Sequence, residues 1–166
     1  NRAHQPLDKA ISGLKDIIAK AFEQRSKIIV PAFALGRIQE LIYILHKLTD
    51  QHAIPRLPIY IDSPLAESLT SVFQKHSEEF DVETWKDFGR RGESPFEFRN
   101  FIHLRTVEES KSLNEVKGPF MVIAASGMAE GGRIRHHLKH NIEDPNAIIL
   151  ITGYQAEHTL GRKIQE

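Results

Sequence analysis

Residues 120–133 read FMVIAASGMAEGGR, and the rest of the chain is organised around this stretch. Five apolar residues lead into a turn of small residues, and a helical pattern opens on the Gly-Gly-Arg sequence. A continuous apolar run predicts a fully buried strand, and glycine allows a backbone to approach a ligand closely. A helix that begins after such a turn directs N–H groups outward, here beside Arg133. The stretch therefore predicts an anion site, with phosphate as the leading candidate.

The same alternation of strand and helix patterns continues along the chain. Strands are predicted at 27–31, 58–62, 101–105, 120–124 and 147–152, and helices at 6–24, 38–48, 63–76, 106–116, 130–140 and after 156. Strands that alternate with helices in this way are typical of a parallel sheet covered on both faces. The predicted fold class is therefore α/β, with a parallel, Rossmann-like sheet flanked by helices on both faces.

The composition is that of one globular domain without a strong charge. The chain has 166 residues, of which 40% are hydrophobic, and 22 basic residues balance 22 acidic ones. A nucleic-acid partner would have to be met by a local patch, because no domain-wide basic field exists. There is no cysteine, which excludes disulfides and thiolate zinc sites. No apolar run is long enough for a membrane span or a signal peptide, so we expect a cytoplasmic protein without membrane contact.

In a parallel sheet, ligands gather at the carboxyl ends of the strands. The turns that follow four of the predicted strands carry polar and cationic side chains at Arg37, Ser63, Ser126, Arg133 and Tyr154. Arginines give forked, charged contacts to phosphate, and serines add hydrogen bonds. In the alternative interpretation, Arg37 pairs with Glu40 and Arg133 pairs with Glu130 as solvated surface charges. Both interpretations stay open on the sequence.

The residues offer little for catalysis or metal binding. His136 and His140 lie four apart on a predicted helix with His137 beside them, but no third ligand is indicated, and a polar helix face is the simpler interpretation. Asp62 could be a general base or a metal ligand; we favour a cap for the helix that follows it. No Walker motif, dinucleotide fingerprint or Gly-x-Ser-x-Gly elbow occurs. The sequence predicts no catalytic and no metal-binding residue in this chain.

Four blocks of the sequence carry a family resemblance. They are IVPAFALGRIQEL at 29–41, PIYIDSPLA at 58–66, AASGM at 124–128 with GGR at 131–133, and GYQAE at 153–157 with TLG at 159–161. In this order they resemble the conserved blocks of the β-CASP domain of metallo-β-lactamase-fold ribonucleases. They are most similar to the bacterial and archaeal relatives of the endonuclease subunit of the cleavage and polyadenylation specificity factor.

The resemblance implies hydrolysis of RNA phosphodiester bonds by two zinc ions held between two domains. The family's His-x-His-x-Asp-His motif is nowhere in these residues. We therefore expect residues 1–166 to be a single β-CASP-like domain excised from a larger protein. The metallo-β-lactamase domain of that protein would hold the two zinc ions. The expected domain has no cofactor of its own and does not cleave RNA alone.

The resemblance also implies which residues face the cleft between the two domains. The predicted RNA-phosphate-binding residues are Arg37, Ser63, Ser126, Gly127, Arg133 and Tyr154, and the predicted partners are RNA and the metallo-β-lactamase domain. His158 departs from the family, whose members commonly have glycine there.

Two other functions compete with the ribonuclease prediction. One is a catalytically silent scaffold domain of an RNA-processing assembly, and the other is an independent nucleotide-binding α/β module. The residues leave open endonuclease against 5′-exonuclease action, the RNA sequence preference, the oligomeric state (a homo-oligomer included) and the role of residues 77–100. The aromatic residues of that segment could pack in the core or stack on bases, and packing is favoured.

Overall fold

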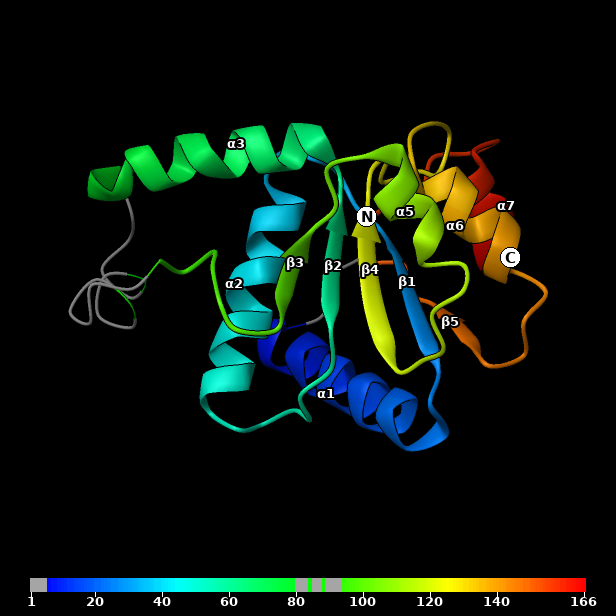
Figure 1. Cartoon of the computed structure of the whole chain (residues 1–166), viewed down its shortest axis with the longest axis horizontal. Helices are drawn as coiled ribbons and strands as arrows, with labels where there is room; N and C mark the ends of the chain where they lie inside the picture. Colours follow the sequence, from blue (N-terminus) through cyan, green and yellow to red (C-terminus); the bar gives the residue numbers. More distant parts are fainter. Residues whose placement is uncertain (1–5, 80–83, 85–87, 89–93) are drawn as a thin grey trace.

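The computed structural model describes residues 6–79, 84, 88 and 94–166. Five strands form one sheet in the order β3-β2-β4-β1-β5, and all the pairings are parallel (Figure 1). The strands are β1 (Lys27–Pro31), β2 (Ile59–Asp62), β3 (Phe101–His103), β4 (Phe120–Ala124) and β5 (Ala147–Ile149). The predicted parallel α/β architecture is confirmed, including the short strand β3.

Helices cover both faces of the sheet. They are α1 (Leu7–Gln24), α2 (Arg37–Asp50), α3 (Pro64–Lys75), the short 3₁₀ helix η1 (Ser77–Glu79), α5 (Val107–Ser112), α6 (Ile134–Asn141) and α7 (Leu160–Gln165). Apolar residues of α1, α2 and the start of α3 form one buried cluster with the sheet, and those of α6 and α7, with Leu113 just after α5, join a second. In Figure 1, α5, α6 and α7 lie together, away from α1 and α2.

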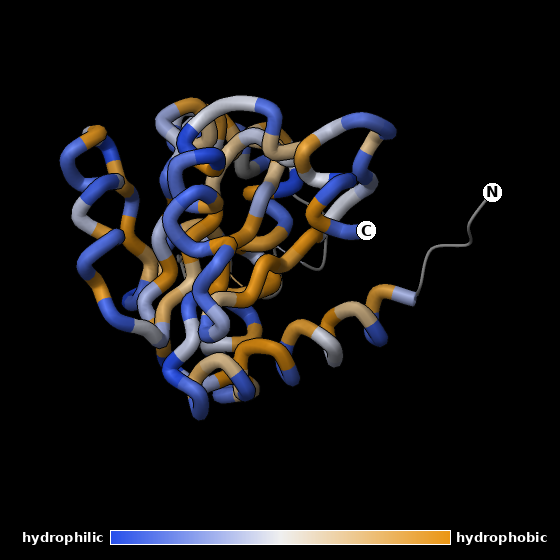
Figure 2. Tube along the Cα trace, turned by 90° about the vertical axis from the view of Figure 1, so that its right-hand side faces the viewer, coloured by the Kyte–Doolittle hydropathy of each residue, from blue (hydrophilic) through white to orange (hydrophobic). Residues whose placement is uncertain are grey.

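The sequence explains why β1 and β4 lie at the centre. All five residues of β4 are buried, as are four of the five residues of β1. Side chains of a strand point alternately to opposite faces, so a strand covered on both faces needs a continuous apolar run. Each fully buried isoleucine or valine here contributes about 1.5–3 kcal/mol. Figure 2 shows hydrophobic residues along the interior, while α1 alternates between hydrophobic and hydrophilic residues.

Helix α6 begins later than its sequence pattern predicts. The prediction began at Glu130, but the helix begins at Ile134. The reason lies in the preceding turn, where Ala129 and Gly132 adopt φ angles of 60° and 73°, outside the helical region. A Cβ atom on Gly132 would lie 2.3 Å from the carbonyl oxygen of Ala125, so only glycine fits there.

Part of the irregular segment 77–100 belongs to the core. Phe88 and Phe96 are buried, and the ring of His46 on α2 lies 4.5 Å from that of Phe88 and 4.8 Å from that of Phe98, between centroids. Packing is therefore confirmed for these phenylalanines. Phe80 and Trp85 lie outside the described residues.

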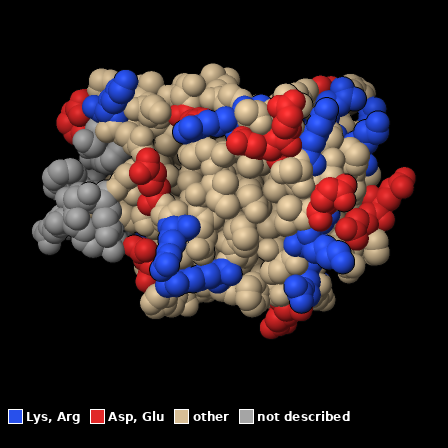
Figure 3. Space-filling view, in the orientation of Figure 1, with Lys and Arg blue, Asp and Glu red and all other residues tan. Residues whose placement is uncertain are grey.

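The surface carries mixed charge. On the face shown in Figure 3, basic and acidic side chains are interspersed and no broad basic surface is seen. A contact with a polyanion on this face would therefore depend on a few local groups. Within the described ranges, no helix is both long and apolar enough to cross a bilayer.

Candidate functional site

The turns after β1, β4 and β5 meet at the carboxyl edge of the sheet. They enclose a pocket of about 220 Å³, which we call the edge pocket. Its lining residues are Pro31, Ala32, Phe33, Arg37, Gly127, Met128, Thr152, Gly153 and Tyr154. Three of the six predicted site residues, Arg37, Gly127 and Tyr154, therefore lie at one pocket. Sequence reasoning did not select Phe33, although an aromatic residue in a turn at this edge was a usable signal.

Phe33 packs directly on Gly127. A Cβ atom at position 127 would lie 2.5 Å from Cδ2 of Phe33, closer than real side chains approach. Phe33 nevertheless stays 45% exposed, and Tyr154 is 73% exposed. The absence of a side chain at position 127 thus lets one aromatic ring lie against the turn while part of it still faces solvent.

Arg37 begins α2 at the rim of the edge pocket. Its Nη1 pairs with Glu40 Oε2 at 2.6 Å, as one sequence interpretation expected, and its side chain is 40% exposed. The turn before it is held by a buried side chain that sequence reasoning missed. Gln39 accepts a hydrogen bond from the Gly36 N–H at 2.8 Å and donates to the Ala34 carbonyl at 3.1 Å. This bonding fixes the position of Phe33 and Arg37 relative to the sheet.

A second buried glutamine joins the other two turns. Nε2 of Gln155 donates to the carbonyl oxygens of Gly127 at 3.0 Å, Gly153 at 3.2 Å and Tyr154 at 3.1 Å. The N–H of Gly161 donates to the Met128 carbonyl at 3.0 Å. Gln155 lies in the GYQAE block but was not selected as a site residue. It positions both walls of the edge pocket against each other.

A different arrangement surrounds the end of β2. The Asp62 side chain is fully buried and accepts hydrogen bonds from three groups, which together we call the Asp62 network. Arg133 Nη1 lies 2.6 Å from Oδ1, His137 Nε2 lies 2.6 Å from Oδ2, and the Ser110 hydroxyl also donates to Oδ2. The expected role of Asp62 as a helix cap is wrong. Ser63 caps α3 instead, because its Oγ accepts from the Ala66 N–H at 3.2 Å.

The Asp62 network keeps the carboxylate ionised. Burial alone raises the pKa of Asp62, but the hydrogen bonds from His137, Ser110 and Arg133 outweigh it and hold the pKa below its ordinary value. Arg133 also donates to the carbonyl oxygens of Leu104 at 3.0 Å and Arg105 at 2.9 Å. Arg133 therefore does not form the surface pair with Glu130 that the alternative interpretation gave it. Glu130 instead accepts a hydrogen bond from the Leu160 N–H.

The start of α6 is not a row of free donors. The Ile134 N–H donates to the Ala125 carbonyl at 3.1 Å, and Arg135 and His136 donate to the carbonyl oxygens three residues before them. The expectation that these N–H groups point outward is corrected, because the turn folds back onto the helix. Ser126 is half-buried, and its Oγ accepts from the Gly131 N–H at 3.4 Å.

The predicted site residues thus fall into two sets. Arg37, Gly127 and Tyr154 line the edge pocket, whereas Ser63 and Arg133 make contacts inside the protein. Ser126 lies in the turn between these two sets.

The histidines of α6 are bonded within the protein. His136 Nε2 lies 3.1 Å from the amide nitrogen of Asn114, and the rings of His136 and His140 are 4.5 Å apart. Burial first, and then the charges of His140 and His137, lower the pKa of His136. Across the described ranges, no three His, Cys, Asp or Glu side chains are grouped so that they could hold a metal ion. The donor groups present therefore do not fit a zinc site.

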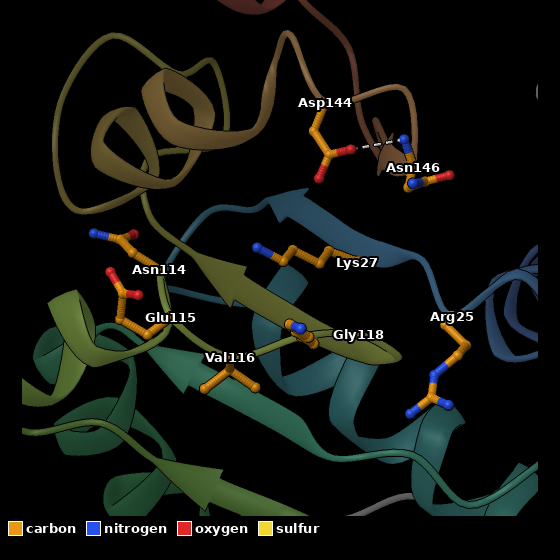
Figure 4. A pocket seen from close by; sticks show the side chains of 9 residues that line it. Arg25, Lys27, Asn114, Glu115, Val116, Gly118, Asp144 and Asn146 are labelled. Atoms are coloured by element: carbon orange, nitrogen blue, oxygen red, sulfur yellow. Dashed lines mark hydrogen bonds between the residues drawn. The ribbon is translucent and has the colours of Figure 1, made fainter.

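A larger hollow of about 380 Å³ lies at the opposite, amino-terminal edge of the strands. Figure 4 shows Arg25, Lys27, Glu115 and Asp144 around it, with Asp144 accepting a hydrogen bond from the Asn146 N–H at 2.9 Å. Basic and acidic groups alternate there, and none of the predicted site residues lines it. The volume of a pocket alone therefore does not identify the candidate site.

Known proteins resemble this chain over nearly its whole length. Ribonuclease TTHA0252 of Thermus thermophilus is 38% identical over 99% of this chain and 37% of its own length. Endoribonuclease ysh1 of Schizosaccharomyces pombe is 33% identical over 98% of this chain and 21% of its own length. Transcription termination factor FttA of Methanosarcina mazei is 31% identical over 99% of this chain and 26% of its own length.

The chain thus spans between 21% and 37% of the length of these relatives. The family model of the Beta-Casp domain matches residues 38–164. This range includes the turns after β2, β4 and β5, with Ser63, Gly127 and Tyr154. The suspected resemblance is confirmed, and the chain belongs to the Beta-Casp domain family.

Proposed function

We propose that this chain is the RNA-holding domain of a zinc-dependent ribonuclease with a metallo-β-lactamase domain. The observation that carries the proposal is the 38% identity to a ribonuclease over 99% of the chain. The family model and the relative named an endoribonuclease support the same class of enzyme.

The edge pocket is the surface on which RNA is held in this proposal. Arg37 supplies a partly exposed guanidinium, and its contact with Glu40 uses Nη1 of a group with five N–H donors. Tyr154 and Gly127 border the same surface. A few contacts of this kind suit a domain with no net charge, because phosphate binding then depends on local groups.

Ser63 and Arg133 have a supporting role in the proposal. Both are bonded inside the protein, Ser63 to the start of α3 and Arg133 to Asp62. The contact of Arg133 with Asp62 joins the turn after β4 to the end of β2, whereas the bond of Ser63 is local to α3. Arg133 already donates to Asp62 and to the carbonyl oxygens of Leu104 and Arg105, so fewer of its five N–H donors are left for a phosphate than at Arg37.

The chemical step is assigned to the metallo-β-lactamase domain. The described residues do not fit zinc, so no metal-dependent step is assigned to them. The domain described here binds and orients the RNA strand, while hydrolysis takes place on the other side of the cleft.

The experiment compares the isolated chain with the full-length protein that carries it. The full-length protein in zinc is expected to cleave a single-stranded RNA of about 20 nucleotides, while the isolated chain binds it without cleavage. Removal of zinc with a chelator should abolish cleavage and leave RNA binding in place. Failure of the zinc-loaded full-length protein to cleave any single-stranded RNA, with binding retained, would instead support a silent scaffold.

A further inference from the structure

We propose that the edge pocket binds one unpaired nucleobase of the RNA, stacked on Tyr154 and Phe33, with Arg37 at the neighbouring phosphate; this inference rests on the proposed function. It assigns base recognition to a surface for which the sequence predicted only phosphate contacts. The aromatic side chains, the size of the pocket and the bonding of its walls carry it.

Two exposed aromatic side chains lie at the same pocket. Tyr154 is 73% exposed and Phe33 is 45% exposed, and both line the same pocket. Every base has an aromatic face, so single-stranded nucleic acids are commonly held by stacking on such rings. Phe33 follows β1 and leans on Gly127 in the turn after β4, whereas Tyr154 follows β5, the neighbour of β1 on the other side.

The size of the pocket limits what it can hold. Its volume of about 220 Å³ is below the roughly 300–1,000 Å³ of sites for drug-sized ligands. A single planar base fits a pocket of this volume better than a whole dinucleotide or a folded peptide does. The partly exposed Arg37 on the rim adds one positive charge, which complements the phosphate attached to that base.

The walls of the pocket are held in place before any ligand arrives. Gln155 donates to carbonyl oxygens in both the Gly127 turn and the Tyr154 turn. Gln39 is bonded to the turn that presents Phe33. Binding to positioned walls costs less ordering entropy than binding to loose ones, so a small pocket can still contribute measurably.

The experiment separates base contacts from phosphate contacts in the isolated chain. Fluorescence anisotropy is measured with a fluorescein-labelled ten-residue oligouridylate and with an abasic ribose-phosphate oligomer of the same length. Wild type is expected to bind the oligouridylate more tightly. Tyr154→Ala should weaken oligouridylate binding by about 5- to 100-fold, the range of stacking on one base, and leave the abasic oligomer unaffected. Tyr154→Phe, which keeps the ring, should stay within about twofold of wild type.

Gly127→Ala provides a second, independent test. The added methyl group would lie 2.5 Å from the Phe33 ring, so the ring must move and the pocket must change shape. Oligouridylate binding should fall while the abasic oligomer binds as before. A circular dichroism spectrum and a melting curve check that the variant is folded. Tyr154 is exposed, so its variants do not depend on this check.

The outcomes distinguish this inference from the proposed function. Equal affinity of wild type for both oligomers, with no effect of Tyr154→Ala, would overturn the base pocket while RNA binding stands. Absence of binding to either oligomer would overturn the base pocket and the proposed RNA-holding function together.

Discussion

The edge pocket and the Asp62 network occupy the same edge of one sheet, yet their environments are opposite. Each contains an arginine 2.6 Å from a carboxylate: Arg37 with Glu40, and Arg133 with Asp62. The side chains of the first pair are 40% and 46% exposed, and those of the second are 21% and 0% exposed. An exposed pair of this kind contributes little to stability and stays available to a ligand, whereas a buried pair cannot be opened cheaply.

The difference follows from what surrounds each carboxylate. Asp62 ends β2, next to the central strand β4, and α5 and α6 bring Ser110 and His137 onto it. Glu40 lies in the first turn of α2, on the solvent side. Similar residue types thus form a buried contact inside the fold in one region and an exposed pair in the other.

The largest expected effect comes from removing the buried carboxylate. Asp62→Ala should lower the free energy of unfolding by about 3–5 kcal/mol, because it leaves Arg133 and His137 without their partner. Glu40→Ala, which removes the exposed carboxylate at the same distance from an arginine, should cost only about 0.2–1 kcal/mol. Urea unfolding followed by circular dichroism measures both. Equal losses would contradict the contrast between the two regions.

Acidification should act on the same network with a smaller effect. Because the folded state holds the pKa of Asp62 below its ordinary value, its contribution is fully present above about pH 4. It is lost as the pH falls through the pKa of the folded protein, since the unfolded chain then binds more protons.

The measurement is the free energy of unfolding from pH 7 to pH 3. Asp62→Asn removes the titrating group and keeps the shape of the side chain, so its stability should fall less steeply below pH 4 than that of wild type. Parallel curves for wild type and Asp62→Asn would show that other carboxylates cause the acid sensitivity.

The third prediction concerns RNA binding by the exposed Arg37. Arg37→Ala should weaken binding of single-stranded RNA several-fold and lower the slope of log affinity against log salt by about 0.7, the value for one phosphate contact on a single strand. Its effect on unfolding should stay below about 1 kcal/mol, because the pair with Glu40 is exposed. Arg37→Lys, which keeps the charge, should retain the salt slope.

Arg133→Ala should show the reverse pattern. It should destabilise the protein and leave the salt slope of RNA binding unchanged wherever the variant is still folded. A drop in slope for Arg133→Ala, with none for Arg37→Ala, would transfer the phosphate contact from the edge pocket to the Asp62 network.

The smallest expected effect concerns the turn that follows the edge pocket. His158 has a φ of 68°, a left-handed conformation that favours glycine. His158→Gly should raise the free energy of unfolding by up to about 1 kcal/mol, because relief of strain exceeds the entropy that glycine adds to the unfolded chain. Glu157→Gly, at a neighbouring exposed position, should destabilise slightly.

Local residue patterns predicted most of the fold. The apolar runs at β1 and β4 define buried central strands, and the helical patterns between the strands define the helices that cover the sheet. The start of α6 was missed because its position depends on φ angles at Ala129 and Gly132, which composition alone does not reveal. Helix α5 also ends at Ser112 rather than near Val116.

The sequence predicted the edge of the sheet at which the candidate site lies, but not the side-chain contacts within it. Parallel strands bring their carboxyl ends to one edge, so the turns with Arg37, Gly127 and Tyr154 could be assigned to it from periodicity. Their meeting in one pocket depends on the strand order, which places β1 between β4 and β5. The sequence did not indicate Phe33 and Gln155, because their roles depend on contacts with Gly127, which lies in a turn after a different strand.

The sequence by itself determined the layered α/β architecture and the edge of the sheet at which the polar turns lie, because both follow from local apolar periodicity and turn chemistry. Only the tertiary structure decided that Arg133 pairs with the buried carboxylate of Asp62, whereas the side chain of Arg37 remains exposed. Asp62 and Arg133 are 71 residues apart, and the pairing β2 to β4 brings them within 2.6 Å. Burial then makes that contact a permanent part of the fold, whereas exposure leaves Arg37 free to exchange partners.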